Sequence, residues 1–346
     1  MKILQNELLA NYTSLKVGGE AKNLIKLESN DNIAEIVENI KGKIWVLGSG
    51  TNTLISDEGL DGTTIINNNG YISVSNNLVT ADSGANWDDV VKKSIKAKLF
   101  GLELMSGIPG TVGGAIVGNI AAYGQQVADT LDNITVYNTA TKKINTIKNQ
   151  SLGFAYRSSN LQKNKNLIVL SATFKLSPSP TMQLEYDSAL KVAVKLGLVP
   201  HSLQNRRKII IETRRQAGSL LTNNASSHAT AGSFFKNPVV NKNQVASILA
   251  FEETNVAQSI LLRQNQLHGG KSTRISASHV LLASGFKRGQ TWGKVRLHPD
   301  HILKIENMGS AKAQDIYDVV EFIIGTVKSK LKIELQPEVQ FLGNFK

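Results

Sequence analysis

Cysteine and long apolar runs are absent from this 346-residue chain, and acidic residues are few. The lack of cysteine excludes disulfides, thiolate metal ligands and cysteine nucleophiles. No run of about 18 apolar residues is present to cross a membrane, and the first residues do not have the pattern of a secretion signal. We therefore expect a cytoplasmic protein with no membrane partner. Asp and Glu total 27 against 39 Lys and Arg, which leaves a net charge of +12.

The positive charge is compatible with nucleic acid, acidic membrane or phosphate-bearing small molecules as partners. Aromatic residues make up 6% of the chain, which leaves few surfaces for base stacking, and no nucleic-acid-binding motif is present. Residues 191–217 hold seven Lys and Arg against Glu212, so they carry +6, half of the excess. Two interpretations of this segment stay open: a solvated helix face, or the lining of a pocket for an anionic ligand.

Mixed helical and strand patterns, without strict βαβ alternation, predict an α+β fold, and the length suggests two or three domains. Helices are expected at residues 30–40, 87–99, 188–196, 202–216, 243–251, 276–284 and 311–331. Strands are expected at residues 21–27, 43–47, 63–66, 134–138, 144–147, 168–176, 301–305 and 339–342, with a hairpin over 71–81.

Two glycine-rich segments are candidates for binding phosphate. The first, Gly48, Ser49, Gly50, Thr51 and Asn52, follows a predicted strand, and its backbone N–H groups could bind an anion; a plain turn is about as good an explanation. The second, residues 101–124, holds seven glycines and Pro109 and shows no regular periodicity. Long irregular segments are usually functional, so we expect it to contact a ligand; a tightly packed buried connection is the alternative.

Three further residues have side chains suited to catalysis. Arg157 lies beside Tyr156 and could hold a carboxylate through its two-pronged guanidinium. Ser233 precedes two phenylalanines without a nucleophile-elbow motif, so it is either a turn serine or a proton donor. Glu338 enters the last predicted strand and could act as acid, base or electrostatic partner. The six histidines have no metal-ligand spacing, and we expect no metal.

Together, and in this order along nearly the whole chain, these segments resemble the UDP-N-acetylenolpyruvoylglucosamine reductase family. The resemblance rests on the following segments: Asn11-Tyr12-Thr13-Ser14-Leu15, Leu47 to Asn52, Gly107 to Gly114, Asn119 to Gly124, Tyr156-Arg157-Ser158-Ser159, Gly232-Ser233-Phe234-Phe235-Lys236-Asn237-Pro238 and Pro337-Glu338-Val339. The Gly232 to Pro238 run is the most specific of them.

The resemblance implies an FAD-binding fold of the PCMH or vanillyl-alcohol-oxidase type, in two subdomains, with a C-terminal α+β substrate-binding domain. It places the first subdomain at residues 1–67, joined by the strand within 333–346, the second at 68–205 and the substrate-binding domain at 206–332. It further implies a monomer that uses FAD and NADPH to reduce UDP-N-acetylglucosamine enolpyruvate to UDP-N-acetylmuramate for peptidoglycan. In this reaction hydride passes from flavin N5 to the vinyl carbon.

The resemblance also assigns roles to individual residues. Ser233 matches the proton donor, and Arg157 and Glu338 match the groups that hold the carboxylate and stabilise the enol. Pre-placed donors of this kind favour the transition state, because the enolate charge appears only after hydride transfer. The cofactor-binding positions are Gly48, Ser49, Gly50, Thr51, Asn52, Ile108, Pro109, Gly110, Thr111, Gly113, Gly114, Asn119, Ala122, Tyr123 and Gly124. The substrate-binding positions are Tyr186, Arg214, Lys236, Asn237 and His301.

Three departures accompany the resemblance. Ala217 stands where many members have a lysine, and Lys208 or a nearby Arg could replace it. His279-Val280-Leu281-Leu282 replaces a run common in the family, and His301 stands where some members have glutamine. Tyr186 matches the tyrosine of the substrate-covering loop in the longer subtype, which would exclude water.

Two other functions remain to be separated from this one: a different flavin oxidoreductase of the same fold, and a basic nucleic-acid-binding protein.

Overall fold

The structure is a computed structural model that describes residues 2–27, 32–220, 229–251 and 274–346. The chain forms two compact units. Unit 1 comprises Met1–Glu7, Ala21–Gly50 and Asp61–Thr222, and unit 2 comprises Leu8–Glu20, Thr51–Leu60 and Asn223–Lys346. The segment from Gly48 to Asn52 therefore crosses from one unit to the other.

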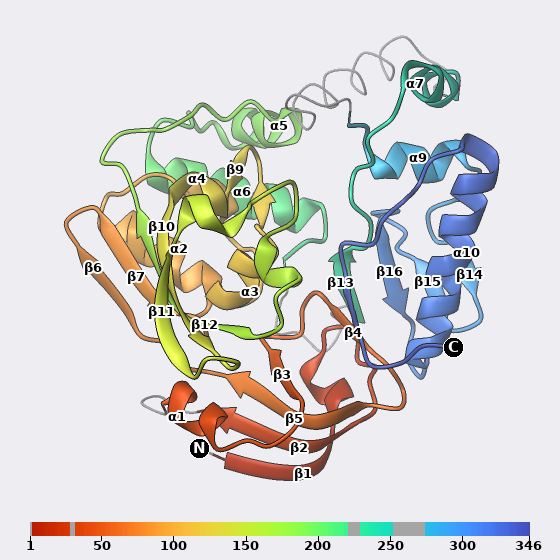
Figure 1. Ribbon diagram of the computed structural model, residues 1–346. Coiled ribbons are helices and arrows are strands. Elements are labelled where there is room, and N and C mark those ends of the chain that lie inside the picture. Colours follow the sequence, from red (N-terminus) through yellow and green to blue (C-terminus); the bar gives the residue numbers. More distant parts are fainter. Residues whose placement is uncertain (1, 28–31, 221–228, 252–273) are drawn as a thin grey trace. The chain divides into compact units, whose positions relative to one another are not determined.

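Unit 1 is built around a five-stranded antiparallel sheet in the order β11-β10-β12-β7-β6 (Figure 1). Its strands are β6 Ile72–Ser75, β7 Leu78–Asp82, β10 Leu131–Asn138, β11 Lys143–Lys148 and β12 Leu167–Lys175. Helix α2 (Trp87–Lys96) contributes the fully buried Trp87, whose ring meets Phe174 of β12 edge to face at 5.8 Å. This contact helps to fix α2, and the loop that follows it, on the sheet.

A second sheet in the order β1-β2-β5-β3 completes the strand framework of unit 1. Its strands are β1 Lys2–Leu8, β2 Glu20–Leu27, β3 Ile44–Leu47 and β5 Leu60–Asn67, and β3 pairs with β5 in parallel. The remaining described elements here are α1 Ile33–Glu38, η2 Glu103–Met105, α3 Val112–Val117, β8 Ala121–Ala122, β9 Gln125–Gln126, α4 Val127–Thr130, η3 Asn149–Leu152, η4 Asn160–Gln162, α5 Asp187–Leu196 and α6 Leu203–Gln216.

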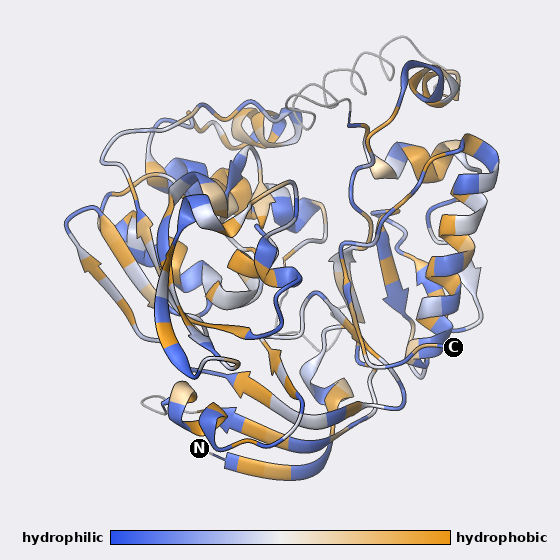
Figure 2. Cartoon of the chain, in the orientation of Figure 1, coloured by the Kyte–Doolittle hydropathy of each residue, from blue (hydrophilic) through white to orange (hydrophobic). Residues whose placement is uncertain are grey.

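Unit 2 contains an antiparallel sheet in the order β13-β16-β15-β14. These strands are β13 Ala229–Ser233, β14 Thr291–Trp292, β15 Val295–Leu297 and β16 Lys304–Asn307. Its helices are η1 Leu9–Tyr12, α7 Lys242–Leu249, α9 Ala277–Ala283 and α10 Ala313–Leu331, and a parallel pair joins β4 Thr53–Ile55 to β17 Gln340–Leu342. Along α10, Ile316, Val320, Ile323 and Val327 recur at helical spacing and are fully buried, and Figure 2 shows this apolar stripe beside a hydrophilic one.

The predicted α+β content is confirmed, and most predicted elements are present within a few residues. Two expectations were wrong. The segment 101–124 contains the short helix α3, which we missed because its sequence, VGGAIV, holds two glycines with poor helix propensity. The strand expected at 301–305 begins only at Lys304, because His301 lies in a turn that Lys304 N–H closes by donating to the His301 carbonyl at 2.9 Å. Of the helix expected at 30–40, residues 30 and 31 lie outside the described residues.

Candidate functional site

The start of the first glycine-rich segment, at Gly48, lies against the second segment within unit 1. A Cβ atom added to Gly48 would lie 2.7 Å from Oγ1 of Thr111, closer than real Cβ atoms approach their neighbours. The N–H of Gly113 donates to the carbonyl of Ser83 at 2.8 Å, and a Cβ there would lie 3.1 Å from the Ser83 Cβ. A side chain at Gly48 would therefore have to displace the Thr111 hydroxyl, and the structure brings Gly48 and Thr111, predicted from separate motifs, together.

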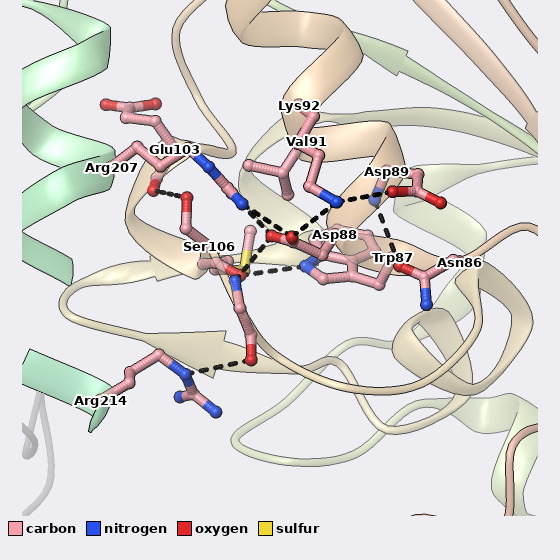
Figure 3. Close-up of polar contacts among 12 residues, drawn as sticks. Asn86, Trp87, Asp88, Asp89, Val91, Lys92, Glu103, Ser106, Arg207 and Arg214 are labelled. Carbon is pink, nitrogen blue, oxygen red and sulfur yellow. Dashed lines mark hydrogen bonds and ion pairs between the residues drawn. The ribbon is translucent and has the colours of Figure 1, made fainter. Parts of the chain in front are cut away.

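Asp88 is the centre of a polar cluster that fastens the second segment (Figure 3). Its Oδ1 accepts from the backbone N–H of Gly107 at 2.7 Å, and its two carboxylate oxygens accept from the Arg207 guanidinium at 2.7 and 2.8 Å. Burial alone would raise the pKa of Asp88, but the hydrogen bonds from Arg207 and Gly107 outweigh it and hold the pKa below its usual value. The carboxylate therefore stays charged and pins α6 and Gly107 to the start of α2.

The carbonyl of Gly107 is held as well, by Arg214. Nε of Arg214 donates to this carbonyl at 3.2 Å (Figure 3). Nη2 of Arg214 donates to the carbonyl of Ser219 at 2.8 Å. Burial lowers the pKa of Arg214 from its ordinary value, although the guanidinium remains a cation at any physiological pH. Arg214 thus braces the second glycine-rich segment, and a substrate contact by this residue would use its remaining N–H groups.

Most of the cations on the basic helix α6 bond to other groups of unit 1. Arg206 pairs with the fully buried Glu103 at 2.7 Å and also donates to two backbone carbonyls, and Arg215 pairs with Glu212 at 2.6 Å. With Arg207 held by Asp88, three of the seven cations counted in residues 191–217 are neutralised by carboxylates of the same unit. Neither open interpretation of this segment, a solvated face or an anion pocket, describes Arg206 and Arg207.

Arg157 lies at the tip of a tight turn. The backbone groups of Ala155 and Ser158 bond to each other in both directions at 3.0 and 3.1 Å, and Arg157 has a φ of +53°, in the left-handed region. Nδ2 of Asn119 donates to the Ala155 carbonyl at 3.0 Å, and Oγ of Ser159 donates to the Val117 carbonyl at 2.8 Å. The second glycine-rich segment therefore holds the turn that presents Arg157.

Asn119 itself is almost fully buried, and its side chain is engaged with the chain. Besides Ala155, Nδ2 reaches Oε1 of Gln126 at 3.2 Å, and Oδ1 accepts from the N–H of Ala128 at 3.0 Å. A cofactor contact by Asn119 would therefore use its backbone. The other predicted cofactor positions are arranged around it: Ile108, Pro109, Gly110 and Thr111 precede α3, Gly114 lies in α3, Ala122 ends β8, and Tyr123 with Gly124 forms the turn to β9.

The predicted substrate tyrosine lies among aromatic and cationic groups of unit 1. The ring of Tyr186 meets Tyr123 edge to face at 5.6 Å. Burial raises the pKa of Tyr186 to about 12, against a lowering by the positive charge of Arg157. Burial raises the pKa of Tyr123 too, and Arg214 opposes that shift. The structure thus brings Tyr186, Arg157, Tyr123 and Arg214 into one neighbourhood of neutral phenols and cations.

In unit 2, Ser233 ends strand β13 just after a β-bulge. The pairing of β13 with β16 shifts register between Thr230 and Ser233, and Gly232 has a φ of +78° at this point. Nothing lies within 4 Å of a Cβ added to Gly232, so the backbone conformation, not space, requires glycine. Such a bulge re-aims the side chain that follows it, which here is Ser233.

Glu338 lies beside this strand. The N–H of Glu338 donates to the Phe234 carbonyl at 2.8 Å, and the N–H of Lys236 donates to the Gln336 carbonyl at 2.9 Å. On its other side, Nδ2 of Asn52 donates to the Glu338 carbonyl at 3.1 Å. Two of the three predicted catalytic residues, Ser233 and Glu338, therefore occur on adjoining segments of one unit, next to the predicted cofactor residue Asn52.

Two other substrate-binding residues predicted in unit 2, Asn237 and His301, differ in whether their side-chain atoms already have hydrogen-bond partners. Oδ1 of Asn237 accepts from the N–H of Ala277 at 2.9 Å, so it caps the start of α9. Nδ1 of His301 is buried with no hydrogen-bond partner among the described residues. Burial, followed by the positive charge of Lys304, lowers the pKa of His301 to about 4, so its ring is neutral at pH 7.

No motif of the sequence indicates the ion pair of Asp88 with Arg207 or the effect of Lys304 on His301. Asp88 and Arg207 meet across 119 positions, and no local pattern marks such a pair. The motif-based residues fall into two groups, Arg157, Tyr186 and Arg214 in unit 1, and Ser233, Lys236, Asn237, His301 and Glu338 in unit 2.

Across the described ranges, no helix is long and apolar enough to span a bilayer, and no cluster of three or more His, Cys, Asp or Glu forms a candidate metal site.

Comparisons with known proteins agree on one family. Residues 21–146 match the family model of an FAD binding domain, and residues 223–342 match that of the C-terminal domain of UDP-N-acetylenolpyruvoylglucosamine reductase. The proteins of that name from Saccharopolyspora erythraea and Mycolicibacterium gilvum are each 30% identical to this chain. The match with the first relative covers 95% of this chain and 93% of that relative. The match with the second covers 99% of this chain and 96% of that relative. The solved reductase from Thermus caldophilus, at 22% identity, shares the fold with a TM-score of 0.66 over 99% of this chain and 98% of its own.

Proposed function

The chain belongs to the UDP-N-acetylenolpyruvoylglucosamine reductase family, and from this premise we propose that it reduces UDP-N-acetylglucosamine enolpyruvate to UDP-N-acetylmuramate with FAD and NADPH. The observation that carries the proposal is the placement of Ser233 and Glu338 on adjoining segments of unit 2, which the bond from the Glu338 N–H to the Phe234 carbonyl joins. The proposed location is cytoplasmic, with a monomeric enzyme and the subdomains at the boundaries expected from the sequence.

The residues of unit 1 fit an FAD site. Gly48 and Gly113 let the backbone pack closely against Thr111 and Ser83, and glycine-rich segments of this kind can bind a pyrophosphate group through backbone N–H groups. The positions proposed to hold FAD are those named from the sequence, with Asp88 and Arg214 fixing Gly107 between them. When bound, FAD supplies the hydride that it has taken from NADPH.

The chain's own residues hold the substrate in this proposal. Tyr186 closes over it and excludes water, and its raised pKa keeps the phenol a hydrogen-bond donor throughout the working pH range. Neutral His301 offers Nδ1 as an acceptor, consistent with a buried atom that has no partner within the described residues. Arg214, Lys236 and Asn237 supply further donors to the sugar nucleotide.

The proton step falls to Ser233. Arg157 holds the carboxylate end of the enolpyruvyl group, Glu338 stabilises the enol, and the O–H of Ser233 gives its proton to the carbon next to that carboxylate. Because negative charge develops on the enolate only during the reaction, a fixed cation such as Arg157 stabilises the transition state more than the substrate. The strained turn that carries Arg157 is tied down by Asn119 and Ser159, which keeps this cation in place.

Replacement of Ser233 tests the proposal. In Ser233→Ala, flavin reduction by NADPH should keep its wild-type rate, while reoxidation by the enolpyruvyl substrate should slow by about 10²–10⁴-fold, the range for losing a general acid. Stopped-flow absorbance of the flavin measures both half-reactions. Ser278→Ala is the matched control, since its hydroxyl bonds Oγ of Ser276 at 3.1 Å at the start of α9.

The wild-type protein decides between the remaining functions. Purified protein should be yellow, and NADPH oxidation should depend on added UDP-N-acetylglucosamine enolpyruvate. Rapid oxygen consumption with an alcohol and no such dependence would support another flavin oxidoreductase. A colourless protein that refuses FAD and binds DNA in a salt-sensitive way would support the nucleic-acid alternative.

A further inference from the structure

Strand β16 carries two buried charged residues within unit 2. All four of its residues are buried, Lys304 with 2% and Glu306 with 3% of their surface exposed. Figure 2 shows β16 as a mainly hydrophilic strand. Ile305, which lies between Lys304 and Glu306 in this strand, belongs to the main apolar cluster of the unit. A lysine is almost never so buried unless its charge is paired, since removing that charge from water is costly.

The strand geometry fixes the face on which Lys304 lies. Side chains two apart on a strand point to the same side, so Lys304 shares a face with Glu306, and Ile305 points to the other. Glu306 is held there by Arg296 of β15, whose Nε donates to it at 2.7 Å. Lys304 is therefore on the polar face of the sheet, away from Ile305.

The bulge in β13 places Ser233 directly opposite this lysine. Thr230 is the partner of Glu306, so an unbroken ladder would set Gly232 against Lys304. The register shift sets Ser233 there instead. In an antiparallel pair, directly opposite side chains lie on the same face with their Cβ atoms about 4.5–5.5 Å apart. The N–H of Phe234 donates to the Leu303 carbonyl at 2.8 Å and continues this pairing just beyond Ser233.

We propose that Lys304 is the positioning residue for the proton donor, its buried ammonium group stabilising Ser233 as it loses its proton to the substrate. This inference rests on the proposed function. The Ser233 O–H bond breaks as the C–H bond forms on the substrate, and the resulting alkoxide lies beside the ammonium. Nζ of Lys304 then returns a proton to Oγ and regains one from water, so the site is restored without any other reactant.

The charge of Lys304 is already felt by its neighbours. After burial, it is the largest influence that lowers the pKa of His301, three positions earlier. The chain between the two is compact, because His298 N–H donates to the Lys304 carbonyl at 2.9 Å and Lys304 N–H donates to the His301 carbonyl at 2.9 Å. A serine is a weak acid in water, and a fixed cation at its side is the simplest way to lower the cost of ionising it.

Replacement of Lys304 by methionine, which is apolar and nearly as long, tests the inference. Reduction of the bound flavin by NADPH should keep its rate, and reoxidation by UDP-N-acetylglucosamine enolpyruvate should slow by about 100-fold, within the range for impaired general acid catalysis. Lys304→Arg, which keeps the charge, should recover most of the rate. Lys294→Met is the control, because Lys294 is exposed and its Nζ only reaches the Ser310 carbonyl at 3.4 Å.

Two readouts separate this role from simple support of the fold. The solvent deuterium isotope effect on reoxidation should rise in Lys304→Met, because proton transfer becomes the slow step. Ethylammonium added to Lys304→Ala should restore part of the reoxidation rate. Should Lys304→Met lose FAD, the same two rates are measured in Lys304→Gln.

The outcomes distinguish this inference from the proposed function. Wild-type reoxidation rates in both Lys304→Met and Lys304→Gln would overturn the role of Lys304 and leave the reductase function standing. Equal slowing of both half-reactions, with no rescue by ethylammonium and no change in the isotope effect, would also overturn it. A wild-type enzyme whose reduced flavin is not reoxidised by the substrate would overturn the proposed function itself.

Discussion

The two units hold their proposed catalytic residues by different means. In unit 1, side chains do the fastening: Asn119 and Ser159 tie down the turn of Arg157, and Asp88 fixes Gly107. In unit 2, backbone bonds do it: Ser233 ends a strand whose continuation, Phe234, pairs with Leu303 on one side and Glu338 on the other. A single side-chain substitution should therefore loosen the site in unit 1, whereas in unit 2 the backbone conformation itself must change.

Among changes outside the proposed catalytic side chains, the largest effect is expected from a backbone change at the bulge. In Gly232→Ala the left-handed conformation becomes strained by about 1–2 kcal/mol, and relaxing it would turn Ser233 away from its direction. A misplacement of about 1 Å can cost roughly 10²-fold in rate, so flavin reoxidation should fall by about that factor. Stopped-flow absorbance and urea unfolding measure the two consequences.

Gly289→Ala is the control for this variant. Gly289 has a φ of +73° and also has nothing within 4 Å of an added Cβ, so it should lose the same stability. Reoxidation should be normal in Gly289→Ala. Equal reoxidation rates in the two variants would show that the bulge does not aim Ser233.

A smaller effect is expected from the side-chain clamp in unit 1. Asp88→Asn removes the charge that Arg207 and the Gly107 N–H share, and hydrogen bonds to charged groups contribute about 1.5–3 kcal/mol. If half of this free energy comes from ordering the second glycine-rich segment for FAD, the cofactor should bind about tenfold more weakly, since about 1.4 kcal/mol is a factor of ten. Fluorescence titration of the apoprotein with FAD gives the dissociation constant.

Asp89→Asn is matched to this change, because Asp88 and Asp89 both lie in the first turn of α2 and both contact Lys92. Asp89 is exposed, so its ion pair should contribute less than about 1 kcal/mol and FAD affinity should stay unchanged. The same loss of affinity in both variants would mean that the negative end charge of α2, and not the clamp, matters.

The smallest effect concerns stability against pH. The folded-state pKa of His301, about 4, lies below the ordinary 6.5, so the unfolded chain binds this proton more readily. The contribution to stability is complete above pH 6.5 and is lost as the pH falls toward 4, by at most about 3 kcal/mol at 1.36 kcal/mol per pKa unit. Urea unfolding at several pH values should show a shallower loss in His301→Gln, and the wild-type loss in the exposed His201→Gln.

The sequence predicted the local features well and the long-range ones poorly. Helices such as α10 follow from apolar spacing, and the run from Gly232 to Pro238 is specific enough to single out Ser233 by itself. The register that sets Ser233 against Lys304 depends on a bulge between strands 71 positions apart, which periodicity does not encode. For the same reason local patterns do not predict the ion pairs of the basic segment, because the carboxylates that neutralise Arg206 and Arg207 lie more than a hundred positions earlier.

The bond between Glu338 N–H and the Phe234 carbonyl has a consequence for protein synthesis. The ribosome adds roughly 5–20 residues per second, so Phe234 waits on the order of 5–20 seconds before residue 338 has been made. During that time Phe234 and Phe235, fully or almost fully buried in the finished protein, lack the segment that pairs with their strand. We therefore expect nascent chains at this stage to expose an aromatic surface and to be the species on which chaperones and proteases act.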